Sequence, residues 1–257
     1  MGVYTTEIAS DKIASDNPIH QRLLKAYYLA VEHITGDVLE IGCGEGRGID
    51  LLAPKSKSYT AIDKIQGVID DLSAKYSDIT FIQDNIPPFK KIADNSFDTI
   101  VSFQVIEHIK NDRLFLEEIK RMLKPGGKAL LTTPNIKLTL TRNPWHIREY
   151  TAEELTDLAS EIFSKVEMKG VGGNEKVMNY HNENRKSVRK ITRFDILNLQ
   201  YNLPAPLLRV PYDILNRLNR NKLKAANNSL VNEISHTDYL LSEKANEALD
   251  LFLMVEK

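Results

Sequence analysis

Five short apolar runs, separated by segments long enough for helices, constrain the fold of this chain more than any other feature. Each run contains β-branched or aliphatic residues and ends near Gly, Asp, Asn or Pro, as strands do. The runs are DVLEIGC, YTAID, ITFIQDN, FDTIVSFQ and KALLTTP. Helix starts are also predicted, with Asn17 as a cap before Pro18 and a capping box of Thr151 and Glu154. The alternation predicts an α/β fold, a Rossmann-like doubly wound parallel sheet covered by helices.

Two further strands are expected after the fifth, in FSKVEMKGV and in the terminal ALDLFLMVEK, which makes seven in all. The terminal run follows a long gap, and this suggests a last strand inserted beside an earlier one. Residues 174–240 do not alternate in the same way. We interpret them as a helical insertion between strands six and seven of a single domain that spans residues 1–257.

Charge and cysteine content narrow the classes of function. The chain has 34 basic and 35 acidic residues, so no overall charge draws it to nucleic acid or membranes. Its single cysteine, Cys43, excludes an intramolecular disulfide framework and suits a reducing compartment. The first residues show no basic stretch before an apolar run, so no secretory signal is expected. No apolar run approaches the roughly 18 residues that span a bilayer. The sequence therefore predicts a cytoplasmic protein.

A glycine-rich turn follows the first predicted strand, in VLEIGCGEGRG. Glycines after a strand and before a helix bring bare backbone and a positive helix end to a ligand, which indicates a nucleotide or nucleoside-like cofactor. The glycines are Gly42, Gly44 and Gly46, so the third comes one residue earlier than in the dinucleotide pattern. No Gly-Lys-Ser/Thr follows, and this excludes a phosphate-binding loop of the Walker type.

Carboxylates at the next two strand ends fit the same kind of ligand. Asp63 closes the second strand, where its two oxygens can accept both hydroxyls of a ribose. Asp84 and Asn85 close the third strand and offer an acceptor and a donor that suit an adenine edge.

These motifs resemble those of the class I S-adenosylmethionine-dependent methyltransferases, over residues 18–172 and 248–257. The matching segments, in order, are VLEIGCGEG, AIDK, IQDN, SFQVIEHI and LKPGGKALLTTPN. The resemblance implies S-adenosylmethionine as cofactor, left as S-adenosylhomocysteine, and a reversed terminal hairpin. It also implies that Glu40 orders the glycine loop near the methionine end, and that Arg22 holds the methionine carboxylate although Leu23 replaces the usual tyrosine. The implied cofactor-binding residues are Arg22, Glu40, Gly42, Cys43, Gly44, Gly46, Asp63, Lys64, Asp84, Asn85 and Gln104.

Three residues after strands four and five are the predicted catalytic set: Glu107, His108 and His146. They resemble a motif of the ubiquinone-pathway O-methyltransferases and of the small-RNA 3′-terminal ribose methyltransferases, in which Glu-x-x-Glu-His and a later His can hold a divalent metal. Gln104 stands here in place of the first glutamate. Because Mg²⁺ prefers carboxylate oxygens, we expect no metal and a neutral histidine as general base. The expected reaction is O-methylation of a small-molecule, glycan or lipid-linked acceptor.

The predicted insertion has a local excess of basic residues, and this excess alone does not identify the methyl acceptor. Residues 185–224 contain ten Lys or Arg and two Asp, interleaved with apolar residues. A solvated helical lid over the substrate, with its apolar face on the core, is one interpretation. Peripheral contact with an anionic membrane is another, and it suits a lipid-linked acceptor. Nucleic acid is less favoured because few aromatic residues are available for stacking.

Two other functions compete with this one, and the sequence does not assign an oligomeric state. An RNA ribose methyltransferase would share the motifs. A non-catalytic cofactor-binding subunit would be expected to have a degenerate glycine loop, and the intact glycines argue against it.

Overall fold

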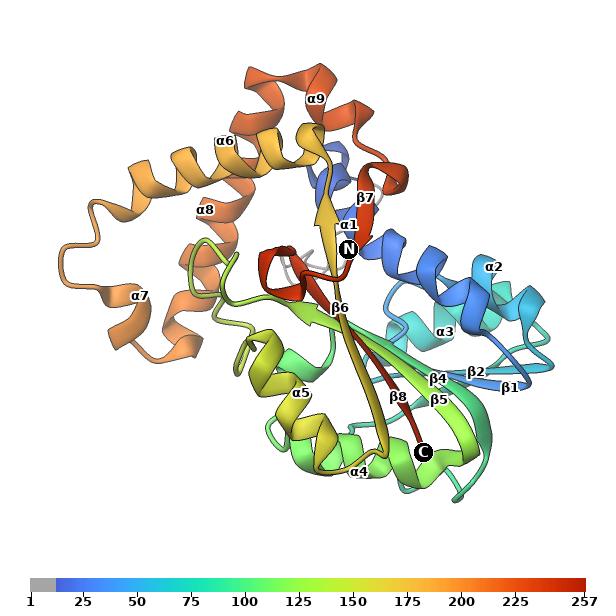
Figure 1. Cartoon of the computed structure of the whole chain (residues 1–257). Coiled ribbons are helices and arrows are strands. Elements are labelled where there is room, and N and C mark those ends of the chain that lie inside the picture. Colours follow the sequence, from blue (N-terminus) through green and yellow to red (C-terminus); the bar gives the residue numbers. More distant parts are fainter. Residues whose placement is uncertain (1–12) are drawn as a thin grey trace.

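Eight strands form one sheet in the order β3-β2-β1-β4-β5-β8-β6-β7 in the computed structural model, which describes residues 13–257 (Figure 1). The strands are β1 (Asp37–Ile41), β2 (Ser58–Asp63), β3 (Thr80–Gln83), β4 (Phe97–Phe103), β5 (Leu123–Pro134), β6 (Lys165–Gly173), β7 (Tyr239–Ser242) and β8 (Asp250–Glu256). The first five run parallel, and β8 lies between β5 and β6, antiparallel to both. The predicted α/β, Rossmann-like sheet with a reversed terminal strand is confirmed. The prediction that there is no secretory signal depends partly on residues 1–12, which lie outside the described residues.

The predicted number of strands, seven, is one short. The additional strand is β7, four residues long, which pairs antiparallel with β6 at the edge of the sheet. Its sequence, YLLS, is too short to show a period of two, and the strand exists because it pairs with β6. The helical insertion does lie between the sixth and seventh strands, but the terminal strand is the eighth.

Helices cover both faces of the sheet, as Figure 1 shows. One apolar cluster includes side chains of α1 (Asn17–Ala30), α2 (Ile49–Leu52) and α3 (Gln66–Lys75). The other includes side chains of α4 (Asp112–Met122) and α5 (Ala152–Ser160). The sheet therefore has a separate apolar core on each face. In sheets of this kind ligands bind at the carboxyl ends of the parallel strands, and we expect the site there.

The two predicted helix starts have different outcomes. Thr151 and Glu154 form the capping box at the start of α5, as predicted. Asn17 is not a cap: α1 begins at Asn17 itself, and Asp16 occupies the N-cap position without a side-chain bond. The Asn17 amide instead donates to the carbonyls of Val231 and Ile234. Tertiary partners far along the chain thus engage a side chain that the local pattern assigned to capping.

Thr151→Ala should lower the free energy of unfolding by about 1 kcal/mol, since it removes the acceptor for the Glu154 amide. Urea unfolding followed by circular dichroism measures the change. Thr156→Ala in the same helix is the matched control, because the Thr156 hydroxyl only donates to the Ala152 carbonyl. An equal loss in both variants would mean that the capping box contributes nothing specific.

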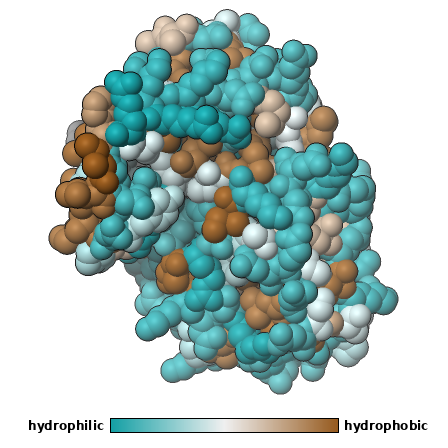
Figure 2. Space-filling model, turned by 60° about the vertical axis from the view of Figure 1, so that its left-hand side comes forward, coloured by the Kyte–Doolittle hydropathy of each residue, from teal (hydrophilic) through white to brown (hydrophobic). Residues whose placement is uncertain are grey.

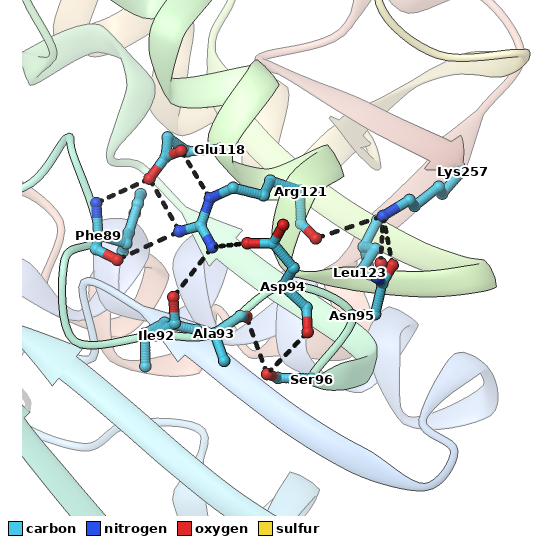
Figure 3. Close-up of polar contacts among 10 residues, drawn as sticks. All are labelled: Phe89, Ile92, Ala93, Asp94, Asn95, Ser96, Glu118, Arg121, Leu123 and Lys257. Atoms are coloured by element: carbon cyan, nitrogen blue, oxygen red, sulfur yellow. Dashed lines mark hydrogen bonds and ion pairs between the residues drawn. The ribbon is translucent and has the colours of Figure 1, made fainter.

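A network around Arg121 fixes the connection from β3 to β4 (Figure 3). The Arg121 guanidinium, at the end of α4, donates to Glu118 at 2.8 Å and to Asp94 at 2.6 Å. It also donates to the carbonyls of Ile92 and Phe89, while the Phe89 amide donates to Glu118. The hydrogen bonds to Glu118 and Asp94 raise the pKa of Arg121. The segment that follows β3, where the adenine-binding residues are predicted, is thereby tied to α4.

The helical insertion extends to one side of the sheet as α6, α7, α8 and α9 (Figure 1). Their bounds are α6 (Glu175–Thr192), α7 (Leu199–Asn202), α8 (Ala205–Ala226) and α9 (Asn228–Glu233). Arg217 and Arg220 of α8 both donate to Asp16, which is fully buried before α1. This pairing attaches α8 to the start of the first helix. Among residues 13–257, no helix combines the length and apolarity needed to cross a bilayer.

Candidate active site

The glycine loop after β1 has the backbone conformation that its composition predicts. The φ angles of Gly42, Gly44 and Gly46 are +78°, +49° and +78°, in the left-handed region that favours glycine. At Gly42 a Cβ would lie 2.4 Å from Cγ2 of Val105, so close packing also excludes a side chain. At Gly44 nothing lies within 4 Å of the place of a Cβ. The loop therefore presents bare backbone to open space at Gly44, as a cofactor cradle requires.

Asp63 lies directly against this loop at the end of β2. Its carboxylate accepts from the amides of Gly44 at 2.9 Å and Ile65 at 3.0 Å. Each carboxylate oxygen has a second lone pair, so one acceptor site per oxygen is left for a ribose hydroxyl. The amide of Asp84 donates to the Asp63 carbonyl at 3.1 Å, which brings Asp84 and the exposed Asn85 to the same edge. Lys64 is exposed beside them.

Glu40 and Cys43 lie beneath the loop. Glu40 is buried and accepts from the hydroxyls of Tyr27 and Tyr59, both at 2.7 Å. Burial raises the pKa of Glu40 to about 7, and burial also raises the pKa of the Cys43 thiol. A Cβ at Gly48 would lie 1.8 Å from the Tyr27 ring. Glu40 therefore holds the end of the loop through Tyr27, without a hydrogen bond of its own to the loop.

Arg22 lies on α1 and is paired with an acidic residue, and Gln104 lies at the carboxyl end of β4. Nε of Arg22 lies 3.2 Å from Oδ2 of Asp250, a carboxylate whose pKa burial raises. Gln104 follows β4 with a φ of +59°, and its side-chain amide donates to the Thr132 hydroxyl at 3.3 Å. Arg22 and Gln104 line the same large cavity.

The three predicted catalytic residues come together. Glu107 and His108 lie in a 3₁₀ turn after β4 (Ile106–His108), and His146 lies in the connection after β5. One ligand atom from each lies within 4.8 Å of the others, and this set could hold a cation. The two imidazole rings are 5.0 Å apart and meet edge to face.

The hydrogen bond of His108 determines which ring nitrogen carries a proton. Nδ1 lies 2.9 Å from the carbonyl oxygen of Trp145, an acceptor only, so Nδ1 must donate. In the neutral ring the lone pair is then on Nε2, which lies 4.0 Å from Oε1 of Glu107. A neutral His108 therefore presents the lone pair that a general base requires on Nε2.

His146 has the same tautomer, but both of its nitrogens are engaged. Oδ1 of Asn143 accepts from the Trp145 amide, so Nδ2 of Asn143 faces Nε2 of His146 at 2.8 Å and donates to it. Nδ1 of His146 donates to Glu149 at 2.7 Å. His146 is thus held in place on both sides.

Glu107 is almost completely buried. Its Oε2 accepts from the Thr133 hydroxyl at 3.0 Å, whereas Oε1 has no hydrogen-bond partner within the described chain. Burial raises the pKa of Glu107 to about 7. A negative charge here would be stabilised by a proton arriving on the neighbouring His108.

A cavity of about 920 Å³, a size typical of small-molecule sites, lies beside the predicted catalytic residues, whereas the glycine loop, Asp63, Asp84 and Asn85 are not among its lining residues. It is lined by Arg22 and Gln104 from the predicted cofactor set and by Glu107, His108 and His146 from the predicted catalytic set. Its other walls are largely apolar side chains of α6, α7 and α8. The insertion therefore encloses the predicted acceptor site, the position expected of a lid, while its movement stays a prediction.

Sequence reasoning missed several polar residues that position the site. Glu149 follows His146 at the i+3 spacing of a turn, a signal that could have identified it. Asp250 and the two tyrosines on Glu40 had no such signal, because strand pairing and helix packing bring them in from distant segments.

Comparison with known proteins finds similarity to methyltransferases over part of the chain. Residues 39–131 match the family described as methyltransferase domain. A probable S-adenosylmethionine-dependent methyltransferase of Mycolicibacterium smegmatis is 35% identical over 162 residues, 60% of this chain and 62% of that protein. A ubiquinone biosynthesis O-methyltransferase of Rickettsia conorii is 30% identical over 103 residues, 38% of this chain and 35% of that protein. The chain spans less than two thirds of the length of either relative.

A solved structure shows the same fold. The SAM-dependent methyltransferase of Thermotoga maritima, described as a possible histamine N-methyltransferase, has a TM-score of 0.56 with 15% identity. The superposition covers 93% of this chain and 91% of that one. At this identity the likeness concerns the fold alone.

Proposed function

We propose that this chain, whose residues 39–131 match the methyltransferase domain family, transfers a methyl group from S-adenosylmethionine to an oxygen of an acceptor held in the cavity. The predicted family and the predicted cofactor agree with the family match and with the relatives named as S-adenosylmethionine-dependent methyltransferases. One observation carries the proposal: a single cavity is lined by Arg22 and Gln104 of the predicted cofactor set and by all three predicted catalytic residues.

The residues at the strand ends fit the proposed cofactor. The open space at Gly44 admits a ligand next to the backbone, and the Asp63 carboxylate beside it has acceptor capacity for ribose hydroxyls. Arg22 lines the cavity as a cation whose Nε is 3.2 Å from Asp250, and it is our candidate to hold the methionine carboxylate. The cofactor, when bound, supplies a methyl group on a sulfonium leaving group.

The protein must then position the acceptor hydroxyl and remove its proton. Nε2 of His108 is the nitrogen that can take this proton, since Nδ1 already donates to Trp145. The Glu107 carboxylate, 4.0 Å away, stabilises the imidazolium that forms. His146, fixed by Glu149 and Asn143, supports the His108 ring edge to face.

Turnover should survive removal of divalent metal. The Gln104 side chain donates to Thr132, and both nitrogens of His146 have protein partners, so the set near Glu107 is not preorganised for a cation. The assay is transfer of label from methyl-labelled S-adenosylmethionine to acceptors in a cell extract, with and without EDTA. We expect equal rates.

Two results would contradict different parts of this proposal. If EDTA abolishes transfer and Mg²⁺ or Mn²⁺ restores it, Glu107, His108 and His146 are metal ligands. If no label is transferred under any condition while the cofactor binds, the chain is a binding subunit and has no methyltransferase activity of its own.

A further inference from the structure

Apolar side chains are exposed over the outer part of the helical insertion. Ile196 is 89% exposed, and Phe194 and Leu197 are each 71% exposed. We name this surface the apolar crest; it consists of Phe194, Ile196, Leu197, Tyr201, Leu207, Val210, Ile214 and Leu218. Figure 2 shows apolar side chains gathered at the left edge of the molecule, on the side where the insertion lies. The interpretation that the insertion turns its apolar face to the core is therefore wrong for these residues.

The crest has the pattern of a helix face that needs a second partner. Leu207, Val210, Ile214 and Leu218 recur at spacings of three and four on α8 and are 56% to 67% exposed. The opposite side of the same helix lines the cavity, for example through Tyr212. Solvation of so many contiguous apolar groups is unfavourable, and such patches mark protein or membrane contacts.

The crest is continuous with the cavity. Several side chains are exposed to solvent and line the cavity at the same time. They are Ile191, Phe194, Ile196, Leu197, Leu199, Leu207 and Leu215. Apolar side chains therefore extend from the outer surface of the crest into the cavity, with Thr192, Asp195 and Gln200 as polar neighbours in the same wall.

Basic residues flank the crest. Arg189, Lys190 and Arg193, at the end of α6 and just beyond it, are exposed. Within residues 13–257 no ion pair to an acidic group involves any of the three, although Arg193 packs over the Phe194 ring. The other basic residues of the insertion include several that are used internally, such as Arg217 and Arg220 on Asp16. The cations nearest the crest are thus the ones available to an external anion.

We propose that the apolar crest inserts into an anionic lipid surface, and that the cavity receives a lipid-linked acceptor directly from it. Exposed apolar side chains with Lys and Arg beside them are the combination that binds such surfaces. A second copy of this chain fits less well, because a symmetric contact through the crest would bring Arg189, Lys190 and Arg193 of both copies together. The identity of the acceptor as lipid-linked depends on the proposed methyl transfer, whereas binding to the surface does not.

Vesicle sedimentation tests the surface without any catalytic step. The full chain should sediment with vesicles of phosphatidylcholine and phosphatidylserine, and less with phosphatidylcholine alone or in high salt. The variant Arg189→Gln/Lys190→Gln/Arg193→Gln should partition about a hundredfold more weakly, at about fivefold for each charge. The charge-matched control is Lys55→Gln/Lys90→Gln/Lys128→Gln, whose residues are exposed outside the insertion. It should bind like the wild type.

Entry of the apolar crest into the lipid is tested separately. Because Cys43 is the only cysteine and is buried, Ile196→Cys can be labelled selectively with an environment-sensitive fluorophore. Its emission should shift to the blue on the same anionic vesicles. Leu240→Cys on β7, where Leu240 is 50% exposed, is the control and should show no shift.

The proposal is overturned if the wild type does not bind anionic vesicles, or if the labelled position 196 reports no change. It is equally overturned if light scattering shows a dimer that Ile196→Ser/Leu197→Ser dissociates, since the crest would then be covered by a second copy. None of these results would bear on methyl transfer, which is measured separately with labelled cofactor. Methyl transfer without vesicle binding would retain the proposed function and reject the lipid surface.

Discussion

Replacing His108 with alanine should lower kcat by about 10²- to 10⁴-fold, the usual contribution of a general base. The expectation comes from the hydrogen bond that fixes Nδ1 on the Trp145 carbonyl and leaves the lone pair on Nε2. The affinity for S-adenosylmethionine should change little, because His108 lies outside the glycine loop. Initial rates of methyl transfer together with calorimetry of cofactor binding separate the two effects.

Two further variants make the His108 result specific. His33→Ala, in a 3₁₀ turn after α1 (Val31–His33) and outside the residues that line the cavity, should have wild-type kcat. Added imidazole should partly restore turnover to His108→Ala, because a small exogenous base can replace the lost one. Wild-type kcat in a folded His108→Ala, with the loss found instead in His146→Ala, would transfer the role of base to His146.

Asp63→Ala should weaken S-adenosylmethionine binding by roughly ten- to a hundredfold. A carboxylate that accepts from ribose hydroxyls contributes about 1.5 to 3 kcal/mol. The side chain also holds the amides of Gly44 and Ile65, so part of the loss would come from a loosened loop. Calorimetric titration with the cofactor measures the sum.

Asp63→Asn separates the two contributions, since an amide oxygen can still accept from the loop but carries no charge. Its affinity should lie between those of the wild type and Asp63→Ala. Asp71→Ala, an exposed carboxylate on α3, is the matched control and should bind normally. Unchanged affinity in a folded Asp63→Ala would reject the ribose role, and a preference for NADH would contradict the cofactor.

The sequence predicts those features of the site that depend on local order along the chain. Asp63 could be assigned because a strand end in a parallel sheet faces the ligand crevice, and β2 ends where its pattern predicts. The glycine loop could be assigned because left-handed φ angles favour glycine. The parallel order of five strands followed from their alternation with helices.

Features that depend on contacts between distant segments could not be predicted. Asn17 has the local pattern of a cap, but the Val231 carbonyl, 214 residues away, accepts from its side chain. Nothing near Tyr27 in the sequence indicates that its hydroxyl donates to Glu40, because the packing of α1 on β1 brings the two residues together. The exposure of Ile196 also depends on tertiary structure, because a basic, apolar segment gives the same pattern whether it packs inward or faces out.

The central claim is that this chain moves a methyl group to an oxygen of a small acceptor, and mass spectrometry of the product tests it most directly. The wild type and His108→Ala would each be incubated with trideuteromethyl S-adenosylmethionine and a cell extract. We predict a small-molecule or lipid product that gains one trideuteromethyl group on oxygen, and its near absence with His108→Ala. Label found only in RNA, or no labelled product although the cofactor binds, would contradict this account.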